Sequence, residues 1–190
     1  MADRIYLSYR LRGYEERTMM RHFETLLRLF PFSLSAAGLS SLRVHALDYA
    51  EPPLAEIAIN GPPDAAAVVK AASEFLSPDC AYLVYGYWDL WQREREWQLR
   101  PSPVVLACFG PGFEEESYDH LRIELGPDTL FEPPPGDPAG KQKIHSNLQS
   151  IVRLSHDLDS ALPVESRRLW TESGLNFADR LRFLLSTTER

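Results

Sequence analysis

The spacing of apolar residues changes repeatedly within the first ninety residues, and the order of these changes constrains the fold more than any other feature. Apolar and polar side chains alternate over residues 5–11, which predicts a strand with one buried face. Residues 15–30 place apolar side chains three or four positions apart and are followed by Pro31, which predicts a helix. Alternation returns over residues 42–46 and 55–59, so we expect a β-hairpin there.

A second helix and a fourth strand complete this half of the chain. Asp64 is a suitable N-cap for a helix that reaches about Leu76, and a strand then runs from Cys80 to Trp88. The resulting order, strand-helix-strand-strand-helix-strand, is typical of ferredoxin-like proteins, in which two helices cover one face of an antiparallel sheet. We therefore predict an α+β protein with a ferredoxin-like βαββαβ N-terminal half.

Two later segments are expected to extend the sheet, and one segment is ambiguous. Residues 104–109 form a continuous apolar run and residues 120–125 alternate, so both are predicted strands. Residues 89–100 fit two structures. As a helix this segment places Leu90 and Trp97 on one face, whereas as a strand it aligns two tryptophans and two arginines on one side.

The remainder of the chain predicts helices attached through a linker. Residues 133–140 read Pro-Pro-Pro-Gly-Asp-Pro-Ala-Gly, a composition typical of linkers. Residues 141–190 contain two stretches with helical apolar spacing. We predict a sheet domain over residues 1–132, the linker at 133–140, and C-terminal helices over 141–190 that pack on the second face of the same sheet.

The charge distribution argues against nucleic-acid binding. The net charge is −7, and residues 44–140 carry seventeen acidic against five basic side chains. Affinity for nucleic acid comes chiefly from neutralised phosphates. The third predicted strand, residues 54–60, also lacks the aromatic and basic residues with which the RNA-recognition fold binds bases.

The same composition indicates a location and a source. The chain has no apolar run of about 18 residues, which a membrane helix needs, and its first residues lack the apolar core of a signal peptide. We expect a cytoplasmic protein without membrane contact. The strong excess of arginine over lysine favours a GC-rich bacterial genome.

Candidate chemical groups are few. No metal-ligand spacing, phosphate-binding loop or nucleophile motif occurs, so no metal or cofactor is predicted. Cys80 and Cys108 lie in apolar runs, which indicates buried, reduced thiols. The only acid–base candidates are His45, His120 and Glu124, which would flank a cleft if their strands lie close together.

The densest feature is a belt of six aromatic residues between Tyr82 and Trp97, which contains three of the four tryptophans. Aromatic residues beside arginines are typical of protein interfaces. We define the aromatic–acidic surface as this belt's outer part together with the acidic loop that follows: Tyr87, Trp91, Arg93, Arg95, Trp97, Glu114, Glu115, Glu116 and Tyr118.

Two functions remain open. We expect a non-catalytic binding or adaptor protein that docks a protein partner through the aromatic–acidic surface. The alternative is a small enzyme that uses His45, His120 and Glu124 for acid–base chemistry. The lack of a nucleophile, metal or phosphate motif favours the binding protein, and the sequence leaves the oligomeric state open.

Overall fold

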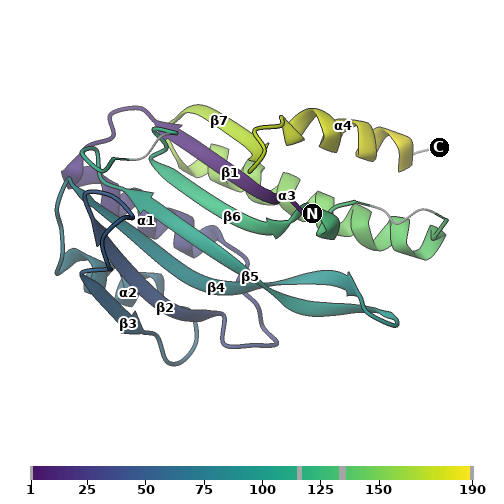
Figure 1. The fold of residues 1–190 in the computed structure, drawn as a ribbon, viewed down its shortest axis with the longest axis horizontal. Coiled ribbons are helices and arrows are strands. Elements are labelled where there is room, and N and C mark those ends of the chain that lie inside the picture. Colours follow the sequence, from purple (N-terminus) through teal and green to yellow (C-terminus); the bar gives the residue numbers. More distant parts are fainter. Residues whose placement is uncertain (1, 115–116, 133–135, 189–190) are drawn as a thin grey trace.

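The computed structural model describes residues 2–114, 117–132 and 136–188, and this part of the chain folds into one antiparallel sheet with four α-helices (Figure 1). The strands are β1 (Arg4–Leu11), β2 (Leu39–Ala46), β3 (Ala55–Ala58), β4 (Cys80–Arg93), β5 (Trp97–Phe109), β6 (Leu121–Pro127) and β7 (Val164–Thr171). The helices are α1 (Glu16–Leu29), α2 (Ala65–Ser73), α3 (Pro138–Ala161) and α4 (Phe177–Thr188), with a short 3₁₀ turn at Asp128–Leu130. The predicted α+β class is confirmed.

The strand order differs from the ferredoxin-like arrangement that we expected. The first six elements do follow the predicted strand-helix-strand-strand-helix-strand order, but the sheet order is β3-β2-β4-β5-β6-β1-β7. Helix α2 therefore connects β3 to β4, which have only β2 between them in the sheet. Helix α1 connects β1 to β2, which are separated by β4, β5 and β6. The physical reason is that β4, β5 and β6 follow one another in the chain without an intervening helix among the described residues, and each pairs with the next. This meander occupies the space beside β4.

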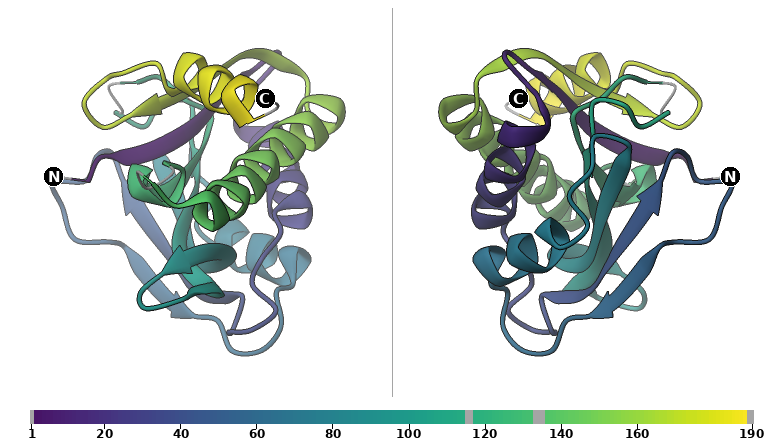
Figure 2. Two further views of the ribbon diagram at one scale, coloured as in Figure 1. Left: turned by 90° about the vertical axis from the view of Figure 1, so that its right-hand side faces the viewer. Right: turned by 90° about the vertical axis from the view of Figure 1, so that its left-hand side faces the viewer.

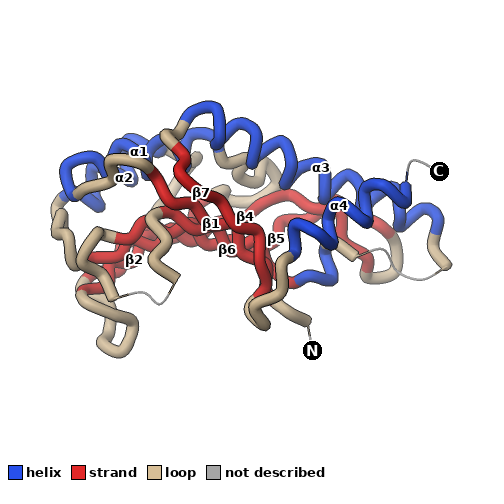
Figure 3. The backbone as a smooth tube through the Cα atoms, turned by 90° about the horizontal axis from the view of Figure 1, so that it is seen from above, coloured by secondary structure: helices blue, strands red, loops and turns tan. Residues whose placement is uncertain are grey.

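Helices α1, α2 and α3 cover one face of the sheet, and the opposite face carries no helix among the described residues (Figures 2 and 3). Apolar side chains from α1 and α3, such as Phe23 and Ile151, share one core with inward residues of β1 and β6, such as Leu7 and Ile123. Helix α4 contacts α3 and β7. The prediction that C-terminal helices cover the second face is therefore wrong, because α3 adds to the layer that α1 and α2 begin.

Local sequence explains where the helices begin. Asp64 caps α2 by accepting a hydrogen bond from the backbone N–H of Ala67 at 3.1 Å. Asp137 caps α3 by accepting from the N–H of Gly140 at 2.8 Å, and Pro138 occupies the first turn, where its missing N–H costs no hydrogen bond. Part of the predicted linker is thus helical, while residues 133–135 lie outside the described residues.

Two further differences concern strands. Residues 89–100, which fit either a helix or a strand, form the distal part of a long β4–β5 hairpin that extends beyond the rest of the sheet (Figure 1). Strand β7, which pairs with β1, lies in the segment for which only helices were expected. Among the described residues, no helix is both long and apolar enough to cross a membrane.

Candidate functional site

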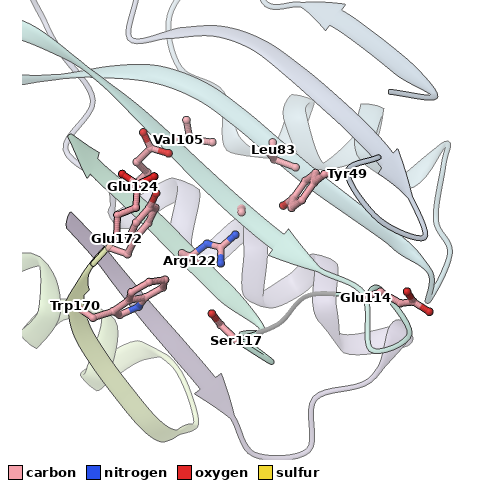
Figure 4. A pocket seen from close by; sticks show the side chains of 11 residues that line it. Tyr49, Leu83, Val105, Glu114, Ser117, Arg122, Glu124, Trp170 and Glu172 are labelled. Atoms are coloured by element: carbon pink, nitrogen blue, oxygen red, sulfur yellow. The ribbon is translucent and has the colours of Figure 1, made fainter. Parts of the chain in front are cut away.

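The uncovered face of the sheet is hollowed into a cavity of about 570 Å³ (Figure 4). Its apolar floor comes from the central strands β4 and β5, and its polar wall comes from β6, β1 and β7. The loops after β2 and β5 close the far side. The lining residues are Tyr6, Tyr49, Leu83, Val105, Ala107, Glu114, Ser117, Arg122, Glu124, Trp170 and Glu172.

A buried carboxylate organises the polar wall. The Asp119 side chain is 2% exposed and accepts hydrogen bonds from Ser8 Oγ at 2.8 Å and from Arg168 Nη2 at 2.9 Å. Ser8 Oγ in turn accepts the indole N–H of Trp170 at 2.8 Å. Arg122 Nη1 lies 3.7 Å from the same carboxylate. These contacts join the loop before β6 to β1, β6 and β7.

The Trp170–Ser8 hydrogen bond fixes an aromatic pair on this wall. Tyr6 and Trp170 lie opposite each other on β1 and β7, and their rings stack with centroids 4.6 Å apart. The pKa of Tyr6 is raised by partial burial and, in second place, by the carboxylates of Glu124 and Glu172. The tyrosine hydroxyl therefore stays neutral and able to donate a hydrogen bond at physiological pH.

A second group of rings borders the opposite side of the cavity. Tyr49 meets the rings of His45 and Phe113 edge-on, at centroid distances of 5.2 and 5.1 Å. Phe113 also packs against Phe109, over which the Arg122 guanidinium lies at 4.7 Å. The cavity thus has aromatic residues on both sides and an arginine between them.

The tryptophans of the predicted aromatic–acidic surface pack against α3. The Trp97 indole N–H donates to Asp137 Oδ2 at 3.0 Å, and Arg93 pairs with the same oxygen at 2.9 Å. The ammonium of Lys143 lies 3.4 Å from the centre of the Trp91 ring. Both tryptophans are half-buried, so each retains some exposed surface while it fixes the hairpin to the helix.

The structure does not bring the two halves of that surface together. The N–H of Glu114 bonds to the carbonyl of Leu47, and the N–H of Leu47 bonds to the carbonyl of Asp79, at the beginning of β4. Trp91 lies near the other end of this fourteen-residue strand, about 40 Å away at 3.3 Å per residue, and Trp97 lies opposite Arg93 at the beginning of β5. The surface is therefore two separate regions, and only the acidic loop borders the cavity.

The remaining members of the surface are scattered. Tyr87 is half-buried on β4, and Arg95 is exposed at the hairpin tip. Tyr118 is 71% exposed, and its backbone carbonyl accepts a hydrogen bond from Arg10 at 3.0 Å. Glu115 and Glu116 lie outside the described residues.

The acid–base candidates do not converge. His45 lies on β2 and His120 directly before β6, and two strands separate β2 from β6, a distance of about 14 Å. His120 stacks on Tyr14 at 4.1 Å, and its Nδ1 accepts the N–H of Leu11 at 2.9 Å. Glu124 is paired with Arg4 at 2.9 Å. His120 and Glu124 are thus each engaged elsewhere, and the buried Nδ1 of His45 has no hydrogen-bond partner among the described residues.

Nothing in the described part of the chain suggests a metal centre or a reactive thiol. No group of three or more potential metal ligands occurs among these residues. Cys80 and Cys108 are both buried and reduced. Burial raises the pKa of Cys108 to about 12, which leaves almost no thiolate at neutral pH.

Sequence reasoning missed most of the residues that line the cavity. The alternation over residues 5–11 and 120–125 did place Tyr6, Ser8 and Arg122 on the face away from the core. It gave no indication that this face stays uncovered. Trp170 was missed because four consecutive polar residues, 165–168, occupy the middle of β7 and hide its alternation.

No family model, curated protein or solved structure matches this chain.

Proposed function

We propose that this chain is a non-catalytic binding protein that docks a protein partner on the uncovered face of its sheet. The observation that carries the proposal is the cavity, which combines an apolar floor with aromatic residues on both sides. Aromatic side chains around an apolar centre are typical of protein-binding sites. This location replaces the aromatic–acidic surface as the expected docking site, although Glu114 belongs to both.

The contacts of the polar residues also favour binding over catalysis. Ser8 is 1% exposed and donates to Asp119, and no histidine or lysine contacts its hydroxyl among the described residues. A serine nucleophile needs both exposure and an adjacent base. Glu124 is paired with Arg4 and lies apart from both candidate histidines. The hydrogen bonds and ion pairs of these polar groups therefore fix the shape of the cavity wall.

Two variants with the same chemical change test this proposal. Val105→Arg places a cation on the cavity floor, whereas Val152→Arg places one on the exposed side of α3, where Val152 is 43% exposed. Both folded variants are used as bait in a lysate of the organism that encodes the chain. We expect that Val105→Arg loses the partner that the wild type retains and that Val152→Arg keeps it.

Two results contradict the proposal. One is that the folded Val105→Arg protein retains the partner as well as the wild type does. The other is that no protein is retained specifically by the wild-type bait. Circular dichroism and urea unfolding of both variants establish that each remains folded.

A further inference from the structure

The floor of the cavity indicates an apolar centre in whatever occupies it. Leu83 and Ala107 lie opposite each other on β4 and β5, and Val105 lies on the same face two residues from Ala107. Leu83 and Val105 project toward the cavity (Figure 4), and Ala107 lines it as well. Covering these side chains removes apolar surface from water, which is favourable. An occupant with an apolar side chain at its centre fits this floor.

The cation inside the cavity is already balanced. Arg122 lies 3.7 Å from Asp119, and its guanidinium also lies over the rings of Phe109 at 4.7 Å and Tyr6 at 5.7 Å. Its side chain is only 16% exposed. An incoming acidic group would have to compete with a buried carboxylate for this arginine.

The carboxylates around the cavity differ in whether their charge is balanced by an ion pair. Glu124 is paired with Arg4, but neither Glu114 nor Glu172 forms an ion pair with any described residue. Both side chains belong to exposed residues, and they lie at opposite ends of the cavity (Figure 4). The cavity therefore presents one unpaired negative charge on each side of an apolar floor.

We infer that the docked segment of the partner is basic at both ends and apolar in the middle, with one cation beside Glu172 and the other beside Glu114. This inference rests on the proposed function. Across the sheet, from β7 to β4, the two carboxylates are four strand spacings apart, or about 19 Å, and they are also offset along the strands. The N–H of Glu172 bonds to the carbonyl of Arg4, a level that the strand registers continue to Trp88 on β4, whereas Glu114 lies at the level of Asp79, nine residues or about 30 Å away. The diagonal is about 35 Å, which an extended segment covers in about ten residues, so the two basic residues are about ten positions apart. Arginine suits these positions because its guanidinium binds carboxylates and also packs on aromatic rings.

Three peptides of thirteen residues test this inference. The basic probe is Ac-GRSGSVLVSGSRG-NH2, in which two arginines are ten positions apart, and the other two probes carry glutamine or glutamate in place of both arginines. Each is titrated into the full-length protein by calorimetry. An exposed ion pair changes affinity by up to about fivefold. We therefore expect the basic probe to bind more tightly than the glutamine probe, by up to about 25-fold for two ion pairs, and this ratio to shrink in 0.5 M NaCl.

Matched variants assign the preference to the two carboxylates. The double variant Glu114→Gln/Glu172→Gln should bind the basic and the glutamine probes equally. The control Glu74→Gln/Glu96→Gln removes the same charge from exposed residues that do not line the cavity, so it should keep the wild-type ratio. Equal or tighter binding of the glutamine or glutamate probe by the wild type overturns the inference. So does a preference that survives the double variant, or a failure of every probe to bind.

The two proposals fail separately. If Val105→Arg loses the natural partner while the probes show no preference for arginine, the cavity is a docking site and only the inferred charge of its partner is wrong. If Val105→Arg retains the partner, the docking site itself is wrong, whatever the probes show.

Discussion

Asp119 should be the most important single polar residue of the cavity wall, and Asp119→Ala tests this. The variant removes an acceptor that is buried within the protein. The lost hydrogen bond to Ser8 is charge-assisted and buried, which corresponds to about 1.5–3 kcal/mol. The contact with Arg168 contributes at most about 1 kcal/mol, because the Arg168 side chain is 54% exposed and solvent screens it.

Arg122 adds a smaller contribution. Its guanidinium is 3.7 Å from the carboxylate, and the variant removes this attraction from a largely buried cation. We assign about 1 kcal/mol to this loss, which gives a total destabilisation of about 4 kcal/mol. Asp119→Asn keeps an acceptor for Ser8 and loses only the charge, so about 2 kcal/mol is expected.

Urea unfolding followed by circular dichroism measures both values. Glu96→Ala serves as the control, because Glu96 is exposed at the hairpin tip and its removal should change stability by less than about 0.5 kcal/mol. A double-mutant cycle with Ser8→Ala should give a coupling energy above about 1 kcal/mol. If Asp119→Ala costs less than about 1 kcal/mol, or if the cycle shows no coupling, Asp119 does not hold the cavity wall together.

Three further predictions concern other parts of the fold. The pKa of His120 is lowered from its ordinary 6.5, chiefly by burial, so its contribution to stability is complete above pH 6.5 and is lost as the pH falls below that value. An NMR titration that placed this pKa at or above 6.5 would contradict the assignment. Iodoacetamide at pH 8 should alkylate Cys108 at least about 100-fold faster in urea than in the native protein, because burial raises its pKa to about 12, and similar rates in both states would show that the thiol is accessible. Asn147→Leu should destabilise the protein by about 3 kcal/mol, because Asn147 makes three hydrogen bonds to the backbone of Trp91 and Leu130, and a loss below about 1 kcal/mol would mean that these bonds do not fix α3 to the hairpin.

The sequence predicted the elements whose burial pattern is simple. Residues 5–11 alternate because one face of β1 lies in the core, and α1 carries an apolar stripe that includes Met19 and Phe23. Both patterns are local, so they are visible without knowledge of the fold. The same holds for the Asp64 cap of α2.

The features that were missed depend on contacts between distant residues. Strand β7 is half-exposed at the edge of the sheet, so it needs few apolar residues and shows little alternation. The uncovered face could not be identified from the sequence. Leu83 on β4 and Val105 on β5 are apolar residues on this face, and apolar residues on both faces of central strands predict a second covering layer. In the cavity wall Ser8 contacts Asp119 and Trp170, and each of these residues is more than one hundred positions from Ser8 in the sequence. No local pattern predicts such a contact.

Site-specific photocrosslinking shows which face of the protein contacts the docked partner. The photoreactive amino acid p-benzoylphenylalanine is placed at Val105 in one protein and at Val152 in another, and each is irradiated in the lysate used for partner capture. The cavity floor and the exposed side of α3 are thereby compared with the same reagent. We predict a specific crosslink to the captured partner from position 105 and none from position 152. A partner crosslinked from position 152, or equally from both positions, would contradict docking on the uncovered sheet face.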